Sequence, residues 1–262
     1  MSTIAKYEAR QRIRGTLTLL VVLSFYLVLL VWLYPSIESA GSAIEEYARA
    51  LPESIQAAFA TESIATIGGF LAAEIYQFIW ILMLGLYVTY LGGGLIAADI
   101  ETGRIDTLLA TPVSRTRVVV EKFLSLLVPI LAINVLMPVV VLAAVLSIGE
   151  SLPAFDLVVL HAFSVPYLLV AAAIGLFLSV LVDRADVAQR AGLGVLFALF
   201  TLETVTTGTD VEWLGALSPT RYYDPAAIIV DGEYDLAGAL VLLAATLGLV
   251  IASAEWFRRR DL

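Results

Sequence analysis

The sequence contains no cysteine, a single histidine (His161) and only two lysines among its 262 residues. Without cysteine the chain forms no disulfide, carries no thiol nucleophile and builds no cysteine-based zinc site. A triad of serine, histidine and aspartate would have to use His161, and no G-x-S-x-G run accompanies it. We therefore expect no catalytic residue, no metal site and no cofactor site in this chain.

Charge is also scarce. Charged residues make up 15% of the chain, hydrophobic residues 60%, and the mean hydropathy is +0.94. Soluble proteins average about 25% charged and about 45–50% apolar residues. This much apolar surface exceeds what a soluble fold can cover, so the composition predicts a membrane protein and argues against a soluble enzyme. The net charge of −9 fits acidic loops of the kind that halophilic organisms, haloarchaea among them, favour.

Six runs are long and apolar enough to cross a membrane, which takes about 20 residues for a core about 30 Å thick. They cover about residues 16–34, 75–98, 123–148, 157–182, 191–205 and 236–254. The fifth run is the weakest, because it is short and Glu203 lies near its end. We predict an all-α membrane protein with six transmembrane helices, in which residues 1–262 form a single domain.

Basic residues indicate the orientation of these spans. Thirteen of the 15 lie in the N-terminal segment, the 98–122 and 183–190 connections and the C-terminus, whereas Arg49 and Arg221 lie on the other side. Lysine and arginine concentrate in cytoplasmic loops, so we expect both termini in the cytoplasm of a cell that carries this chain in its plasma membrane.

Two segments outside the spans have an amphipathic pattern. Residues 2–14 alternate apolar and basic positions, which predicts an N-terminal interfacial helix that leads into the first span. In the acidic outer connection, residues 42–60 have apolar side chains at helical spacing. They predict a helical segment that lies on the membrane surface or caps the bundle.

The connection between the second and third spans is unusually long. Adjacent helices need about two to eight connecting residues, whereas this connection, AADIETGRIDTLLATPVSRTRVVVEK, covers residues 97–122. A short helix from about Ile105 to Ala110 would place Ile105, Leu108 and Leu109 on one face. The sequence therefore predicts a helix in this loop with an apolar face.

The boundary to the third span has its own signals. Pro112 disfavours helical backbone at Thr111 and ends the loop helix, and Ser114 is a natural N-cap for the next helix. Arg115 and Arg117 follow in its first turn, where the helix dipole disfavours cations by about 0.3–1 kcal/mol. Both a functional constraint and the positive-inside bias account for this placement.

The loop resembles the cytoplasmic loop of ABC-2-type transporter permeases. There, an acidic residue precedes a glycine turn, a leucine pair, a Pro-Val-Ser-Arg run and a lysine on the next helix. Residues 217–225 (LSPTRYYDP) and the six-span plan extend the similarity more loosely. The residues that carry the match are Glu101, Gly103, Leu108, Leu109, Pro112, Val113, Ser114, Arg115 and Lys122.

This resemblance implies a function. It is strongest to six-span permeases encoded apart from their ATPase, which pair with each other and bind cytoplasmic ABC ATPase subunits through the loop helix. ATP and Mg would be bound by the ATPase, and hydrolysis would drive export of a substrate. The resemblance thus assigns ATPase coupling to the matched residues, and Ile105 joins them through its place on the apolar face. The chain has no G-x-x-x-x-G-K-[ST] motif, so we expect no ATP site and no enzymatic activity of its own.

Alternatives remain open at this point. One is a non-transporting membrane anchor or assembly factor. Another is an ATP-independent secondary transporter, which predicts polar residues at mid-membrane depth, where only Asn134 fits. Helix kinking and one interhelical hydrogen bond also explain Asn134. For the Gly92–Gly94 run we expect close helix packing or a local break in the second span. Neither the substrate nor a nucleic-acid partner is indicated.

Overall fold

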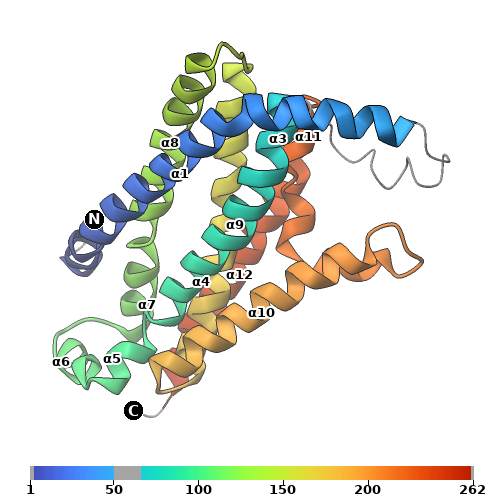
Figure 1. The fold of residues 1–262 in the computed structure, drawn as a ribbon. Coiled ribbons are helices and arrows are strands. Elements are labelled where there is room, and N and C mark those ends of the chain that lie inside the picture. Colours follow the sequence, from blue (N-terminus) through green and yellow to red (C-terminus); the bar gives the residue numbers. More distant parts are fainter. Residues whose placement is uncertain (1–2, 50–65, 261–262) are drawn as a thin grey trace.

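The computed structural model describes residues 3–49 and 66–260, and all regular secondary structure in these ranges is helical (Figure 1). Six segments are long and apolar enough to span a membrane: Ile4–Glu38, Ile67–Glu101, Arg115–Ser147, Ala154–Leu181, Ala185–Thr206 and Leu236–Arg259. Each overlaps one predicted run, with ends that differ by up to twelve residues. The predicted fold class and number of spans are confirmed.

The first helix is longer than predicted. α1 runs from Thr3 to Arg49 with Pro35 inside it, so the N-terminal amphipathic segment and the first span form one continuous helix rather than two. Gly15 is the only helix-weakening residue before Pro35, and one glycine costs a helix about 1 kcal/mol, too little to break it. The placement of residues 2–14 at a membrane interface stays a prediction. Of the outer segment at 42–60, the part up to Arg49 belongs to α1 and the rest lies outside the described residues.

The second span consists of three consecutive helices: α3 (Ile67–Phe70), the π-helix η1 (Leu71–Leu84) and α4 (Gly85–Gly93). A π-helix of this length is rare, since most are single turns, and nothing in the apolar pattern predicts it. Where i→i+5 bonding gives way to i→i+4 bonding, one carbonyl is left without a backbone donor. The hydroxyl of Tyr167 donates to the carbonyl of Ile81 at this junction, at 2.8 Å.

The centre of the bundle is α9 (Ala154–Leu181), which packs against α4, α8, α10 and α12. These neighbours span Leu127–Ser147 (α8), Ala185–Thr206 (α10) and Leu236–Arg259 (α12). Glycines bring α4 and α9 into backbone contact: a Cβ on Gly92 would lie 2.2 Å from the carbonyl oxygen of Ala172. α4 also ends at Gly93, so the Gly92–Gly94 run provides both the close packing and the break that the sequence predicts.

The third span is interrupted. α7 (Arg115–Leu124) ends with Ser125 as its C-cap, and α8 begins at Leu127, whereas the sequence predicted one long helix after the N-cap Ser114. Pro129 explains the break, because proline lacks an amide hydrogen and its ring clashes with the carbonyl four residues earlier, that of Ser125. α1 lies across both α7 and α8 (Figure 1).

The bundle has two distinct ends. One end, which we call the α6 end, carries α5 (Ala97–Glu101), α6 (Arg104–Leu109) and the last turn of α12 (Figure 1). The other, the α11 end, carries two 3₁₀ helices (Glu212–Leu217 and Pro219–Tyr222) and α11 (Pro225–Ile229). At the α11 end the hydroxyl of Tyr234 donates to Asp156 at 2.6 Å, which raises the pKa of Tyr234.

Candidate functional site

The loop at the α6 end is built from two short helices joined by a tight turn. α5 begins against α9, where the hydroxyl oxygen of Ser179 accepts hydrogen bonds from the amides of Ile96 (3.0 Å) and Ala97 (2.9 Å). Gly103 joins α5 to α6 with a φ of 69°, a left-handed conformation that glycine adopts without steric cost. α6 covers Arg104–Leu109, one residue earlier at each end than the predicted loop helix.

After α6, Ser114 is the N-cap of α7, as the sequence predicts. The amide of Arg117 donates to the hydroxyl of Ser114 at 3.3 Å, and α7 starts at Arg115. Pro112 lies in the turn before it and is exposed. The local signals in the sequence therefore placed this turn correctly.

The three apolar residues on the loop helix do not have equal exposure. Ile105 is buried at 2% exposure within the chain, whereas Leu108, Leu109 and Val113 are partly buried and pack against the core. Ile105 therefore does not have the exposed side chain that direct docking into an ATPase would use, and its part in ATPase coupling stays a prediction. Ile105 holds α6 onto the bundle, and the leucine pair keeps part of its surface open.

Glu101 connects the loop to the start of α10. Its Oε2 accepts a hydrogen bond from the amide of Ala185 at 2.9 Å. Ala185 is the first residue of α10, so its amide has no partner inside that helix, and a carboxylate is favourable there. Glu101 thus caps α10 from a different part of the chain.

Behind α6 lies a buried cluster of charged side chains, which we call the ion-pair cluster: Glu8, Arg12, Asp99, Arg104 and Lys122. The Nζ of Lys122 lies 2.8 Å from Oε1 of Glu8 and 2.8 Å from Oδ2 of Asp99. Arg104, which is half-exposed, lies 3.6 Å from both carboxylates. The cluster thereby joins α1, α5, α6 and α7.

Because the side chains of the ion-pair cluster are largely buried, breaking one of their contacts costs stability. The side chains of Lys122 and Asp99 are each 3% exposed, and that of Glu8 is 9% exposed. Removing one partner from a buried pair costs about 3–5 kcal/mol, because the other charge stays behind unpaired. Glu121, the residue before Lys122, is buried as well.

Arg115 has partners that the sequence did not predict. Its partners are not the nearby loop carboxylates of Glu101 and Asp106. Instead the guanidinium donates to the carbonyl oxygens of Phe257 (3.4 Å) and Arg260 at the C-terminus of α12. It also lies over the Phe257 ring, 5.9 Å from its centre. A cation is unfavourable at the N-terminus of α7 but favourable at the C-terminus of α12, which resolves the conflict seen in the sequence.

Glu8, Arg12 and Asp99 are members of the ion-pair cluster that sequence reasoning missed. One signal was available for Asp99, which follows directly on the second apolar run and faces the start of the third, where an ionisable residue is a functional candidate. No such signal pointed to Glu8, since it lies 114 residues from Lys122 in the chain.

The polar residues deep in the bundle form a separate hydrogen-bonded group. The indole of Trp80 donates to Ser164 at 3.1 Å, and Ser164 in turn donates to Asn134. This confirms the interhelical hydrogen bond expected for Asn134. His161 is buried edge-on against Tyr76 and Trp80, with Nδ1 2.8 Å from the carbonyl of Leu157. Within residues 3–49 and 66–260, no group of three or more histidine, aspartate or glutamate side chains could hold a metal ion.

Two further glutamates, Glu74 and Glu203, lie near the ends of their spans. Glu74 is exposed on η1, whereas Glu203 lies 3.8 Å from Arg221, which also pairs with Glu212 at 3.1 Å. These pairs lie at the α11 end and join α10 to the segment that precedes α11. They stabilise the connection between helices and do not contribute to the loop site.

The loop, the six spans and the helical bundle define a class of membrane transport subunit, and comparison with known proteins identifies the family. The profile of the family described as ABC-2 family transporter protein matches residues 2–262. The chain therefore belongs to the ABC-2 transporter family and is a multi-pass membrane permease of an ABC transporter. Such permeases are membrane subunits that usually work with an ABC ATPase and are not themselves catalytic. A search of curated proteins found no match.

Proposed function

We propose that this permease exports its substrate with energy from ATP hydrolysed by a separate ABC ATPase, and that α6 transmits the movement of the ATPase to the spans. The observation that carries the proposal is the anchoring of α6. Buried Ile105 and the ion-pair cluster attach it to α1 and α7, and Glu101 attaches the loop to α10. A force on α6 and its loop therefore reaches three spans.

The surface available to the ATPase differs from the one expected from sequence. Asp106, Thr107 and Pro112 are exposed, and Arg104 is half-exposed. Leu108 and Leu109 add apolar surface that is only partly covered. We assign docking to this mixed surface, with the leucine pair as its apolar part and the polar groups fixing the register.

Orientation follows from the same assignment. The α6 end carries thirteen of the 15 basic residues, which supports its placement in the cytoplasm of a plasma-membrane protein, together with both termini. ATP and Mg would be held in the ATPase, because the chain lacks a phosphate-binding G-x-x-x-x-G-K-[ST] loop.

A homodimer is the proposed form of the permease. α9 occupies the centre of the bundle, with buried side chains from Leu157 to Val180, so a single copy leaves no obvious room for a pathway along its axis. A pathway between two copies avoids this obstacle. α10 supports such an arrangement, because most of its length is not buried within one copy. Its buried residues are Ala188, Gly192, Leu196 and Thr206, and its other residues are exposed or partly exposed to a partner or to lipid.

The test is co-expression with an ABC ATPase encoded beside this chain, purification of the complex and reconstitution into proteoliposomes. We expect mass determination to give two copies of the permease with two ATPase subunits, and ATP hydrolysis to respond to the permease. A chain that binds no ABC ATPase would contradict the proposal and favour a membrane anchor. Transport that persists without ATP would favour a secondary transporter.

A further inference from the structure

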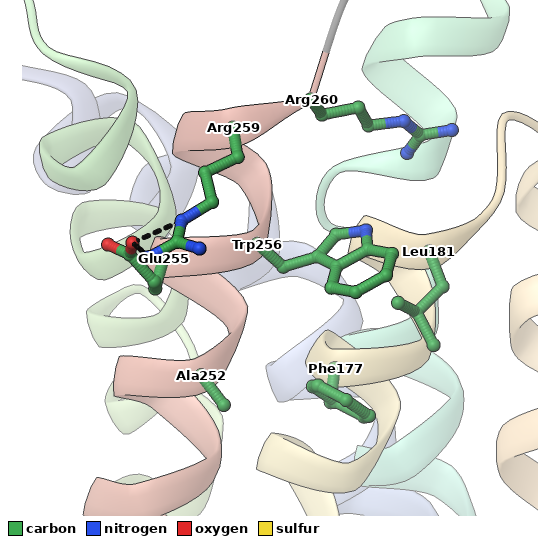
Figure 2. A pocket seen from close by; sticks show the side chains of 7 residues that line it. All are labelled: Phe177, Leu181, Ala252, Glu255, Trp256, Arg259 and Arg260. Carbon is green, nitrogen blue, oxygen red and sulfur yellow. Dashed lines mark hydrogen bonds and ion pairs between the residues drawn. The ribbon is translucent and has the colours of Figure 1, made fainter.

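A groove of about 680 Å³ lies between the last turns of α9 and α12 at the α6 end (Figure 2). Phe177, Leu181, Ala252 and Trp256 form its apolar part, and Glu255, Arg259 and Arg260 form its polar rim. Figure 2 shows Arg260 at the terminal end of α12 and the Arg259 guanidinium folded back onto Glu255 at about the level of the Trp256 ring, with Phe177 and Ala252 further along the helices. The groove is thus polar at the chain terminus and apolar toward the middle of the spans.

Among the described residues, the rim has an excess of positive charge. Arg258 and Arg259 share a single carboxylate, that of Glu255, at 2.7 and 2.5 Å. Arg260 is neutralised by Asp183 and also donates to the carbonyl of Val180 at 2.7 Å. Within residues 66–260, one positive charge of the rim therefore has no matching carboxylate, and the Arg259 side chain that borders the groove is 74% exposed.

The depth of these groups in the membrane follows from the span itself. α12 ends at Arg259, directly after its apolar run, so the arginines lie at headgroup level when the helix crosses the bilayer. Trp256 is 54% exposed one turn below, and tryptophan favours this interfacial level. The apolar side chains then lie at the level of acyl chains.

We propose that this groove binds one anionic phospholipid, with its phosphate at Arg259 and an acyl chain along Trp256 and Phe177. Charge complementarity supports a negatively charged headgroup, because basic pockets between spans bind such lipids. The apolar part supports a lipid over a free anion, which would leave the aromatic side chains without a partner.

The proposed lipid site lies next to the contact between Arg115 and the end of α12. Phe257 and Arg260, which lie on the same last turn of α12, accept hydrogen bonds from Arg115 through their carbonyls. A lipid in the groove would therefore restrain the turn of α12 against which α7 starts. Binding itself does not depend on the proposed coupling to an ATPase and can be measured with the permease alone.

The test uses the purified full chain in nanodiscs of phosphatidylcholine with increasing phosphatidylglycerol, and native mass spectrometry counts the retained lipid. Arg259→Gln removes the groove arginine, whereas Arg258→Gln removes the same charge from the same carboxylate one residue away, outside the groove. We expect Arg259→Gln to bind phosphatidylglycerol about fivefold more weakly, the effect of one interfacial cation, and Arg258→Gln to bind as the native chain does.

A second pair of variants tests the apolar part. Trp256→Leu is expected to reduce retention of phosphatidylglycerol, while Trp32→Leu, at an exposed tryptophan of α1, leaves it unchanged. Equal loss in Arg258→Gln and Arg259→Gln would overturn the proposal, since only diffuse charge would then attract the lipid. Competition by glycerol phosphate as effective as by the whole lipid would overturn it too, as would a change of oligomeric state in Trp256→Leu without a change in lipid retention.

Discussion

Lys122 and Asp99 lie opposite each other at 2.8 Å, and both side chains are only 3% exposed. One comes from α7 and the other from α5, so this contact joins the loop to the third span. Glu8 completes the arrangement from α1 at the same distance from Lys122. Three segments far apart in the sequence thus meet at one ammonium group.

Substituting Lys122 by Met should destabilise the chain by about 3–5 kcal/mol, since two buried carboxylates lose their nearest cation. Arg190→Met is the control, because Arg190 is 81% exposed and lies 3.9 Å from its partner; such a pair contributes about 0–1 kcal/mol. Unfolding in detergent micelles measures both. In a double variant that also carries Asp99→Asn, the loss should be smaller than the sum of the single losses. Additive losses would show that the two groups do not interact.

Replacing Leu108 and Leu109 together by Ala should weaken binding of the ATPase. Full burial of a leucine side chain contributes about 1.5–3 kcal/mol, and both residues are already partly covered, so we expect a total loss of about 1.5–3 kcal/mol. Titration of the reconstituted permease with the ATPase measures it. Ile105→Ala should instead lower the stability of the permease by about 2–5 kcal/mol. Unchanged ATPase affinity in the double variant would remove the leucine pair from the interface.

Arg115→Ala should separate assembly from transport. The substitution removes the contacts of the Arg115 guanidinium with the end of α12 without altering the exposed part of α6, so the ATPase should remain bound and hydrolyse ATP. Transport in proteoliposomes should be lost, because the start of α7 is no longer tied to the last turn of α12. Arg115→Lys keeps a cation for the same carbonyls and should retain part of the transport. Native transport rates in Arg115→Ala would show that this contact has no role in coupling.

Gly92→Ala should destabilise the bundle by about 1–3 kcal/mol, the usual cost of overpacking. The new methyl group would lie 2.2 Å from the carbonyl oxygen of Ala172, and backbone atoms cannot yield as a side chain can. Gly194→Ala is the matched control on α10, where no described atom lies within 4 Å of the added methyl. It should leave stability unchanged or raise it by about 0.5–1 kcal/mol. Comparable stability of the two variants would mean that α4 and α9 are less closely packed than described.

The orientation can be tested by cysteine labelling, for which the chain offers a clean background because it has no native cysteine. Single cysteines at Ser42 and Thr209 should react with an impermeant thiol reagent on intact cells. A cysteine at Thr107 on α6 should react only after the membrane is opened. Labelling of Thr107 from outside would reverse the orientation and, with it, the assignment of the ATPase surface.

Local features of the structure could largely be predicted from the sequence. The apolar runs indicated the six spans, and Pro112 and Ser114 indicated where the loop helix ends and α7 begins. These features depend on hydrophobicity and on hydrogen bonds between residues a few positions apart, so a short stretch of sequence contains the relevant information. The interruption of the third span at Ser125 could also have been predicted from the sequence, because Pro129 follows four residues later.

The partners of the charged residues could not be predicted from the sequence. Arg115 and Arg117 are equally unfavourable at the start of α7 by the helix dipole alone, yet Arg117 pairs with Glu121 one turn on, whereas Arg115 reaches α12. Ile105, Leu108 and Leu109 share the expected face of one helix, but their burial differs because only Ile105 points into the bundle. Such differences arise from the positions of whole helices relative to one another.

By itself the sequence determined the membrane setting, the number of spans and the position of the loop helix, because each follows from the transfer of apolar side chains out of water and from local backbone hydrogen bonding. Only the tertiary structure decided that Lys122 is buried between Glu8 and Asp99, that Arg115 closes the end of α12, and that a charged and apolar groove lies beside it. These contacts join residues up to 145 positions apart. Their strength depends on distance and burial in three dimensions, which the order of residues along the chain does not contain.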